Sequence, residues 1–104
     1  RKLSRDVGTS LTAVGSYTVP AATQTTVIGL TVANTTGATV NIDVTLNDGA
    51  NDTYIVKSAP VPAGGAIVPI GGNQKIVMEP NDSIKVKSDT ATSIDAVLSI
   101  LEIT

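Results

Sequence analysis

Few residues of this 104-residue chain could carry out catalysis. Histidine and cysteine are absent, which excludes the commonest general base and every Ser-His or Cys-His nucleophile. The remaining pairing is Ser83 with Lys85, which are two residues apart and therefore share one face of a strand. We expect both side chains to point into solvent, where neither would be activated. The sequence therefore predicts no catalytic residue, and a protein that is not an enzyme.

Oxygen-bearing side chains gather in a second stretch, between residues 43 and 52. The carboxylates of Asp43, Asp48 and Asp52, with the amides of Asn47 and Asn51, resemble the oxygen-rich loops that bind Ca²⁺. Their spacing does not match an EF-hand loop, and an Asn-Asp-Gly run is also what a tight turn between strands requires. A turn is the simpler interpretation, so we expect neither a metal nor a cofactor.

The composition favours β-strands almost to the exclusion of helices. The chain is rich in Val, Ile and Thr, it lacks Phe and Trp, and its only aromatic residues are Tyr17 and Tyr54. Branched side chains suit the pleated surface of a sheet better than a helix. The length allows one domain with a modest core.

The chain has a net charge of −2 and contains one basic cluster, formed by Arg1, Lys2 and Arg5. Binding nucleic acid without sequence preference requires a basic stripe, so we expect no direct contact with nucleic acid. The cluster is either a solvated terminal arm or an arm that docks on an acidic partner. No apolar run approaches the roughly 20 residues of a membrane-spanning helix, so we expect no contact with a membrane.

The clearest strand is Val40–Asn47, in which apolar and polar residues alternate strictly. A polar loop joins it to Thr53–Ser58, which predicts an antiparallel pair. Similar runs between Gly, Pro and Asn turns give about eight short strands, a spacing typical of an antiparallel β-sandwich or a small barrel. We expect an extended N-terminal arm over residues 1–15, a short strand over residues 16–20, and one sandwich domain spanning residues 16–104.

The C-terminal third is expected to contain a hairpin followed by a long closing strand. Lys75–Glu79 and Ser83–Lys87 flank a turn at Pro80-Asn81-Asp82, where Asn81 tolerates the left-handed conformation of a type II turn. The closing strand, Ser93–Ile103, becomes apolar on both faces after Val97. A sandwich of this size has only one interior, so one of these faces needs another cover.

The surplus apolar residues of the closing strand are Val97, Leu101 and Ile103. One interpretation is that they contact sister subunits in an oligomer, which would also stabilise a domain with few large side chains. The alternative is that the N-terminal arm of the same chain covers them.

Four segments carry a resemblance to a known class of proteins: Tyr17–Pro20, Val27–Thr36, Ile76–Val86 and Ile94–Ile103. Together they resemble small virion structural proteins of tailed bacteriophages, cyanophages among them. Asn81 stands where glycine is usual in the proline turn of these proteins. The resemblance covers most of the chain from residue 16 onward.

This resemblance implies a jelly-roll-like β-sandwich that serves as a capsid decoration or cement protein. Such proteins are commonly trimers that bind the outer shell and bridge capsomers, so the major capsid protein is the expected partner and the virion the expected location, after assembly in the bacterial cytoplasm. The resemblance makes Arg1, Lys2 and Arg5 candidates for contact with the capsid. It makes the strand that carries Val97, Leu101 and Ile103 a candidate for contact between subunits.

Two other functions remain open. A neck, tail or fibre-attachment component of the virion would have the same fold and a lower copy number. A carbohydrate-binding module is common among β-sandwiches, although only Tyr17 and Tyr54 could stack on a sugar ring.

Overall fold

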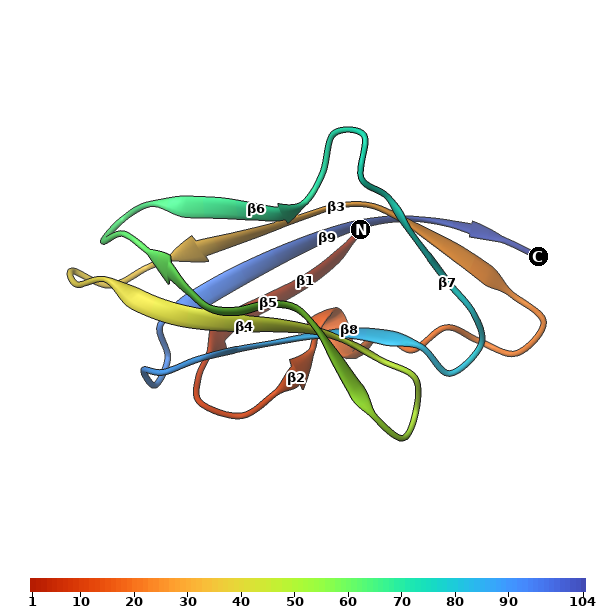
Figure 1. The fold of residues 1–104 in the computed structure, drawn as a ribbon, viewed down its shortest axis with the longest axis horizontal. Coiled ribbons are helices and arrows are strands. Elements are labelled where there is room, and N and C mark those ends of the chain that lie inside the picture. Colours follow the sequence, from red (N-terminus) through yellow and green to blue (C-terminus); the bar gives the residue numbers. More distant parts are fainter.

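Nine β-strands and one short 3₁₀ turn make up the computed structural model, which describes all residues from 1 to 104 (Figure 1). The strands are β1 (Lys2–Val7), β2 (Thr12–Ala13), β3 (Gln24–Asn34), β4 (Val40–Asn47), β5 (Asp52–Val61), β6 (Ala66–Ile70), β7 (Ile76–Met78), β8 (Ser83–Ser88) and β9 (Ile94–Ile103). The 3₁₀ turn, η1, spans Val14–Ser16. The prediction of an almost purely β structure is confirmed.

The strands form two antiparallel sheets that face each other (Figure 1). Sheet A has the order β1-β9-β3-β6, with β7 also paired to β3, and sheet B has the order β2-β8-β4-β5. The predicted single-domain antiparallel β-sandwich is therefore correct. The chain changes sheets repeatedly, so strands from both of its ends lie side by side within each sheet.

The core lies between the sheets and consists almost entirely of Val, Ile and Leu. The largest fully buried side chains include Leu30, Ile42, Ile84 and Leu98, which come from both sheets. Each such side chain contributes roughly 1.5–3 kcal/mol when it leaves water. Met78, Tyr17 and Ala96 are the only core residues of another shape, so branched aliphatic packing holds the sandwich together.

The N-terminal segment is part of the sandwich, contrary to the expected extended arm over residues 1–15. Strand β1 pairs with β9, placing Leu3 opposite Val97 and Val7 opposite Ile94. Strand β2 pairs with β8. A bulge between Ser4 and Val7, with Asp6 at φ 55°, turns Leu3 outward and Val7 inward, so the two apolar residues break the simple alternation by which a strand is identified.

The short strand expected over residues 16–20 is also absent. The 3₁₀ turn η1 ends at Ser16, and the residues that follow run without a sheet partner to β3. Tyr17 and Val19 are nevertheless buried, and Val19 exchanges backbone hydrogen bonds with the turn after β7: its N–H donates to Asp82 O, and its carbonyl accepts from Asn81 N–H. Residues 17–19 are therefore held in place by burial and by the turn after β7, without pairing with a strand of either sheet.

The expected C-terminal hairpin is wrong, although its turn is correct. Asn81 has φ 76°, and Asp82 N–H donates to Glu79 O at 3.0 Å, as the predicted type II turn requires. The flanking strands belong to different sheets, because β7 pairs with β3 while β8 lies between β2 and β4. The turn therefore carries the chain across the sandwich. The predicted β4–β5 pair, in contrast, is confirmed.

Candidate functional site

The most prominent surface feature is an apolar patch on the outside of sheet A, which we call the apolar face. It consists of Leu3, Ile28, Val68, Val77, Val97, Leu101 and Ile103, all of them exposed. Several of them lie on neighbouring strands, because Leu3 lies opposite Val97 and Thr26 lies opposite both Leu101 and Val77. Apolar residues gathered on one face mark interaction surfaces more often than scattered single residues do.

Two irregularities in the sheet widen the apolar face. The pairing of β3 with β9 shifts between Val27 and Gly29, which leaves Ile28 pointing outward while Val27 and Leu30 both face the core. The pairing of β3 with β6 also shifts, and Val68 points outward between the inward-facing Ile67 and Ile70. Each bulge keeps its strand's core residues in place and adds one branched side chain to the outside.

The three residues predicted as an oligomer interface lie together on this face. Val97, Leu101 and Ile103 are exposed to 43%, 55% and 55%, whereas Ile94, Ala96 and Leu98 on the other side of β9 are buried. The prediction of a closing strand that is apolar on two sides is confirmed. The alternative, in which an N-terminal arm covers the outer side, is wrong, because β1 lies beside β9 and adds Leu3 to the exposed surface.

The basic cluster separates into two environments. Arg1 and Arg5 are exposed, and neither forms an ion pair, since the only salt bridge joins Lys87 to Asp43 at 3.6 Å. Lys2 is partly buried, with its ammonium group 5.0 Å from the ring centroid of Tyr17. A cation over an aromatic face is stabilised by the ring quadrupole, so Lys2 has a role within the fold. Within this cluster, Arg1 and Arg5 are the cations available to a partner.

The carboxylates of the Asp-rich stretch serve the turn and the sheet. Asp43 Oδ1 accepts from Ser58 N–H, and Asp48 Oδ1 accepts from the N–H groups of Ala50 and Asn51. These backbone donors lower the pKa of Asp48, and the side-chain amide of Asn47 lowers the pKa of Asp52. No group of three acidic side chains is arranged to hold a metal ion.

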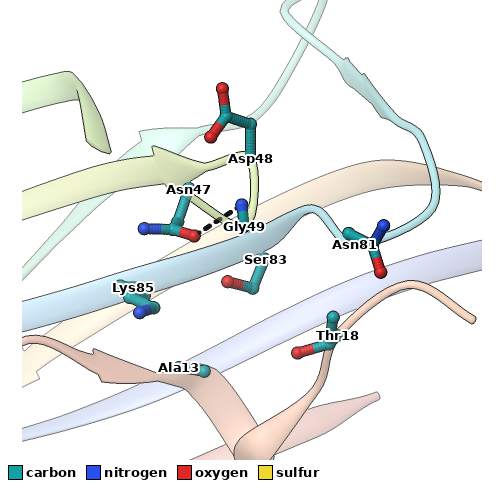
Figure 2. Close-up of a pocket in the computed structure, with 8 residues that line it drawn as sticks. All are labelled: Ala13, Thr18, Asn47, Asp48, Gly49, Asn81, Ser83 and Lys85. Carbon is teal, nitrogen blue, oxygen red and sulfur yellow. Dashed lines mark hydrogen bonds between the residues drawn. The ribbon is translucent and has the colours of Figure 1, made fainter. Parts of the chain in front are cut away.

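A polar cleft lies on the outside of sheet B, next to the β4–β5 loop (Figure 2). Its volume is about 550 Å³, and it is lined by Ala13, Thr18, Asn47, Asp48, Gly49, Asn81, Ser83 and Lys85. Ser83 and Lys85 were expected to point freely into solvent. Ser83 is instead 3% exposed, because the β4–β5 loop and the segment around Thr18 rise on either side of it.

Only one of the two tyrosines has a ring exposed to solvent. Tyr17 is buried, and its hydroxyl donates to Glu102 Oε2 at 2.7 Å and shares a 2.8 Å hydrogen bond with Thr25. Tyr54 is 47% exposed, but the ammonium of Lys57 lies 4.5 Å from its ring centroid. A carbohydrate-binding module of this chain would thus have at most one aromatic ring, that of Tyr54, on which to stack a sugar.

Comparison with known protein families and with curated protein sequences found no match. The structure contains no helix that is long and apolar enough to cross a bilayer.

Proposed function

We propose that this protein is a structural component of a tailed-phage virion, a decoration or cement protein that binds the outer capsid shell. The observation that carries the proposal is the apolar face: seven large apolar side chains exposed on one sheet of a 104-residue sandwich. Such a surface is costly in water and favours burial against another protein surface. We assign its cover to sister copies of the chain, as a homotrimer.

The order of the strands supports a jelly roll, the fold that the resemblance implies. In a jelly roll, eight antiparallel strands are divided between two sheets, and the first strand lies beside the last. The orders β1-β9-β3-β6 and β2-β8-β4-β5 follow that arrangement, with β7 as an addition. Jelly rolls recur in viral capsid proteins and in lectins, so the fold favours a virion role only by analogy.

The exposed cations supply the proposed contact with the shell. Arg5 lies two residues after Leu3 on β1 and therefore borders the apolar face. Arg1 directly precedes the same strand. Arginine pairs with carboxylates in a bidentate geometry that suits an acidic protein surface. We assign Arg1 and Arg5 to an acidic patch on the major capsid protein. Many weak contacts of this kind, repeated over the shell, add up to a strong attachment.

The test is the copy number of this polypeptide relative to the major capsid protein in purified virions, measured by quantitative mass spectrometry. A shell-wide decoration protein is present in numbers comparable to the capsomers. A copy number matching the few subunits of a neck or tail ring would replace this proposal with the neck, tail or fibre-attachment alternative. Complete absence from the virion would refute both.

A further inference from the structure

We propose that residues 99–103 of β9, which we call the open edge, form a site where an extended peptide segment of another protein adds as a further strand of sheet A. The added segment carries a carboxylate at its C-terminal end, which faces Arg1. The open edge consists of backbone groups, whereas the apolar face consists of side chains. The inference goes beyond the virion role and does not depend on it.

The last part of β9 has a neighbouring strand on one side only. Lys2 lies opposite Leu98, and no later residue of β9 pairs with β1, whereas β3 accompanies β9 as far as Ile103. Figure 1 shows β9 running on past the N-terminal end of the chain towards its own C-terminal end. Residues 99–103 therefore lie at an edge of the sheet, although β9 is a central strand over the rest of its length.

The hydrogen bonds of β9 show which backbone groups the open edge presents. Thr35 N–H donates to Ser93 O at 2.9 Å, so residue 93 faces β3. Successive residues of an antiparallel strand direct their backbone groups to opposite sides, and the bulge near Val27 adds its extra residue to β3, so the alternation along β9 is unbroken. The N–H and C=O groups of Ile100 and Glu102 therefore point away from β3, to the side where no strand pairs with them.

The other edges of the two sheets carry features that hinder the addition of a strand. Register shifts interrupt the pairing of β1 and β5, and Pro60 and Pro69 lie within β5 and β6. Strands β2 and β7 are only 2 and 3 residues long. Bulges, prolines and short length are common protections of a sheet edge. The open edge has none of them: it contains no proline or basic residue, and its pairing with β3 is regular from residue 100 to residue 103.

Tyr17 holds the open edge in place from beneath. Its hydroxyl donates to Glu102 Oε2 at 2.7 Å and shares a 2.8 Å hydrogen bond with Thr25 on β3. The ammonium group of Lys2, at the start of β1, lies 5.0 Å from the centroid of the same ring. The end of β9 is thus connected to both neighbouring strands. Because it is ordered before a partner arrives, the addition of a strand costs less conformational entropy there.

Backbone geometry and charge together select the occupant. Backbone donors and acceptors spaced along an extended strand are matched by a second extended peptide. A segment that pairs antiparallel with β9 runs in the direction of β1, so its C-terminal end arrives next to Arg1. Arg1 is exposed and forms no ion pair, and a guanidinium group binds a carboxylate through two parallel hydrogen bonds. The exposed Leu101 favours an apolar side chain beside it on the outer surface.

The experiment is a titration of the full chain with the peptide acetyl-Thr-Val-Thr-Val-Glu, followed by two-dimensional amide NMR spectra. We expect the amide signals of Ile100 and Glu102 to shift with a dissociation constant on the order of 1 mM. In the free protein these two amides should exchange with solvent faster than that of Leu101, which bonds to β3, and the peptide should slow them. No shift at about 10 mM peptide would overturn the proposal. Slow exchange of both amides without peptide would overturn it too, because the edge would then already be paired between copies.

Two modified peptides separate the contributions of backbone and charge. A peptide methylated on the backbone nitrogens that face β9 cannot donate to it and should not bind. A peptide that ends in a glutamine amide carries no carboxylate and should bind several-fold more weakly to the wild type. Arg1→Ser should bind the charged and the neutral peptide equally. Unchanged binding of the methylated peptide would refute strand addition, and a charge preference that survives in Arg1→Ser would refute the assigned direction.

A pair of variants tests the same contact from the side of the protein. Glu102→Pro removes an N–H that the pairing with β3 does not use, so the sandwich should still form. Glu102→Ala keeps this N–H but also loses the hydrogen bond to Tyr17, which makes it the matched control. We expect Glu102→Pro to bind the peptide at least about fivefold more weakly than Glu102→Ala. Equal binding by the two folded variants would contradict the assignment.

Discussion

Leu3 on β1 lies directly opposite Val97 on β9, and both side chains are about half exposed, at 48% and 43%. The first and last strands of the chain thus build one continuous apolar surface. Two branched or long aliphatic residues opposed on the open face of a sheet stabilise each other across the strands, but they still expose much of their area to water. Burial against a second copy would remove that area from solvent.

The proposed role of the N-terminal cations can be tested by point substitutions. Deleting residues 1–5 would remove most of β1 and uncover β9, so it would lower stability as well as attachment. The double variant Arg1→Ser/Arg5→Ser leaves the strand in place and removes the two unpaired charges. We expect it to reduce capsid occupancy, measured on virions assembled with the variant, while its melting temperature stays within a few degrees of the wild type.

Lys2→Ser serves as the comparison, because Lys2 interacts with Tyr17 inside the protein. This substitution should lower the melting temperature, and it should reduce capsid occupancy less than Arg1→Ser/Arg5→Ser does. Full occupancy of the Arg1→Ser/Arg5→Ser variant would remove these residues from the capsid interface.

Gly15 is predicted to be intolerant of any side chain. It adopts φ 63°, and a Cβ at this position would lie 2.7 Å from Lys2 Cβ and 3.1 Å from Leu3 N. Gly15→Ala therefore combines a strained backbone with a steric clash against β1, and we expect it to lower the free energy of unfolding by about 1–3 kcal/mol. Urea denaturation measures the change. Gly37→Ala is the control, since a Cβ added to Gly37 would meet no atom within 4 Å; equal effects of the two would refute the steric account.

Asn34 joins the end of β3 to two other segments of the sandwich. It is 3% exposed, its Nδ2 donates to the carbonyls of Ala38, Val61 and Pro62, and its Oδ1 accepts from Thr36 N–H. Asn34→Ala would leave several of these buried groups without a partner. We expect a loss of about 3 kcal/mol in the free energy of unfolding.

Asn51→Ala provides the comparison for Asn34, because Asn51 is exposed and its side chain forms no hydrogen bond. Its effect should remain within about 0.5 kcal/mol. A loss at Asn34 no larger than this would show that its hydrogen bonds contribute little net stability.

The acid stability of the β4–β5 loop follows from Asp48 and Asp52. Hydrogen bonds hold the pKa of both carboxyls below its ordinary value in the folded protein, from backbone donors for Asp48 and from the Asn47 amide for Asp52. The folded state then binds these protons less readily than the unfolded chain, so their contribution is complete above the unfolded value and is lost as the pH falls through the folded values. The double variant Asp48→Asn/Asp52→Asn should lose less stability than the wild type as the pH falls below about 4, as measured by thermal unfolding. Parallel curves would contradict this assignment.

The alternation of apolar and polar residues in the sequence identified the strands in which it is regular. Val40–Asn47 and Ile94–Ile103 are strands, and both were predictable because apolar residues alternate along the first and along residues 94–100 of the second. The turn at Asn81 was predictable for a different reason, since proline and asparagine suit its backbone angles.

The errors arise where pairing depends on distant residues. A local pattern cannot show that β7 and β8 join different sheets, because each has one apolar side in either arrangement. It also cannot reveal β1, in which the bulge at residues 5 and 6 places Leu3 and Val7 on opposite faces. The polar cleft was missed for the same reason: Thr18, Asp48 and Ser83 lie far apart in the sequence, and only the folded chain brings them together.

The measurement that tests the apolar face most directly is the mass of the protein in solution, by sedimentation velocity at micromolar concentration, for the wild type and for Leu101→Asp. Leu101 is exposed on the apolar face, so the substitution should not disturb the core, and Thr53→Asp on β5 is the matched charge control. We predict that the wild type and Thr53→Asp sediment as trimers of the 10.5 kDa chain and that Leu101→Asp sediments as a folded monomer. A monomeric wild type, or an unchanged trimer in Leu101→Asp, would contradict the claim that this face is buried between copies.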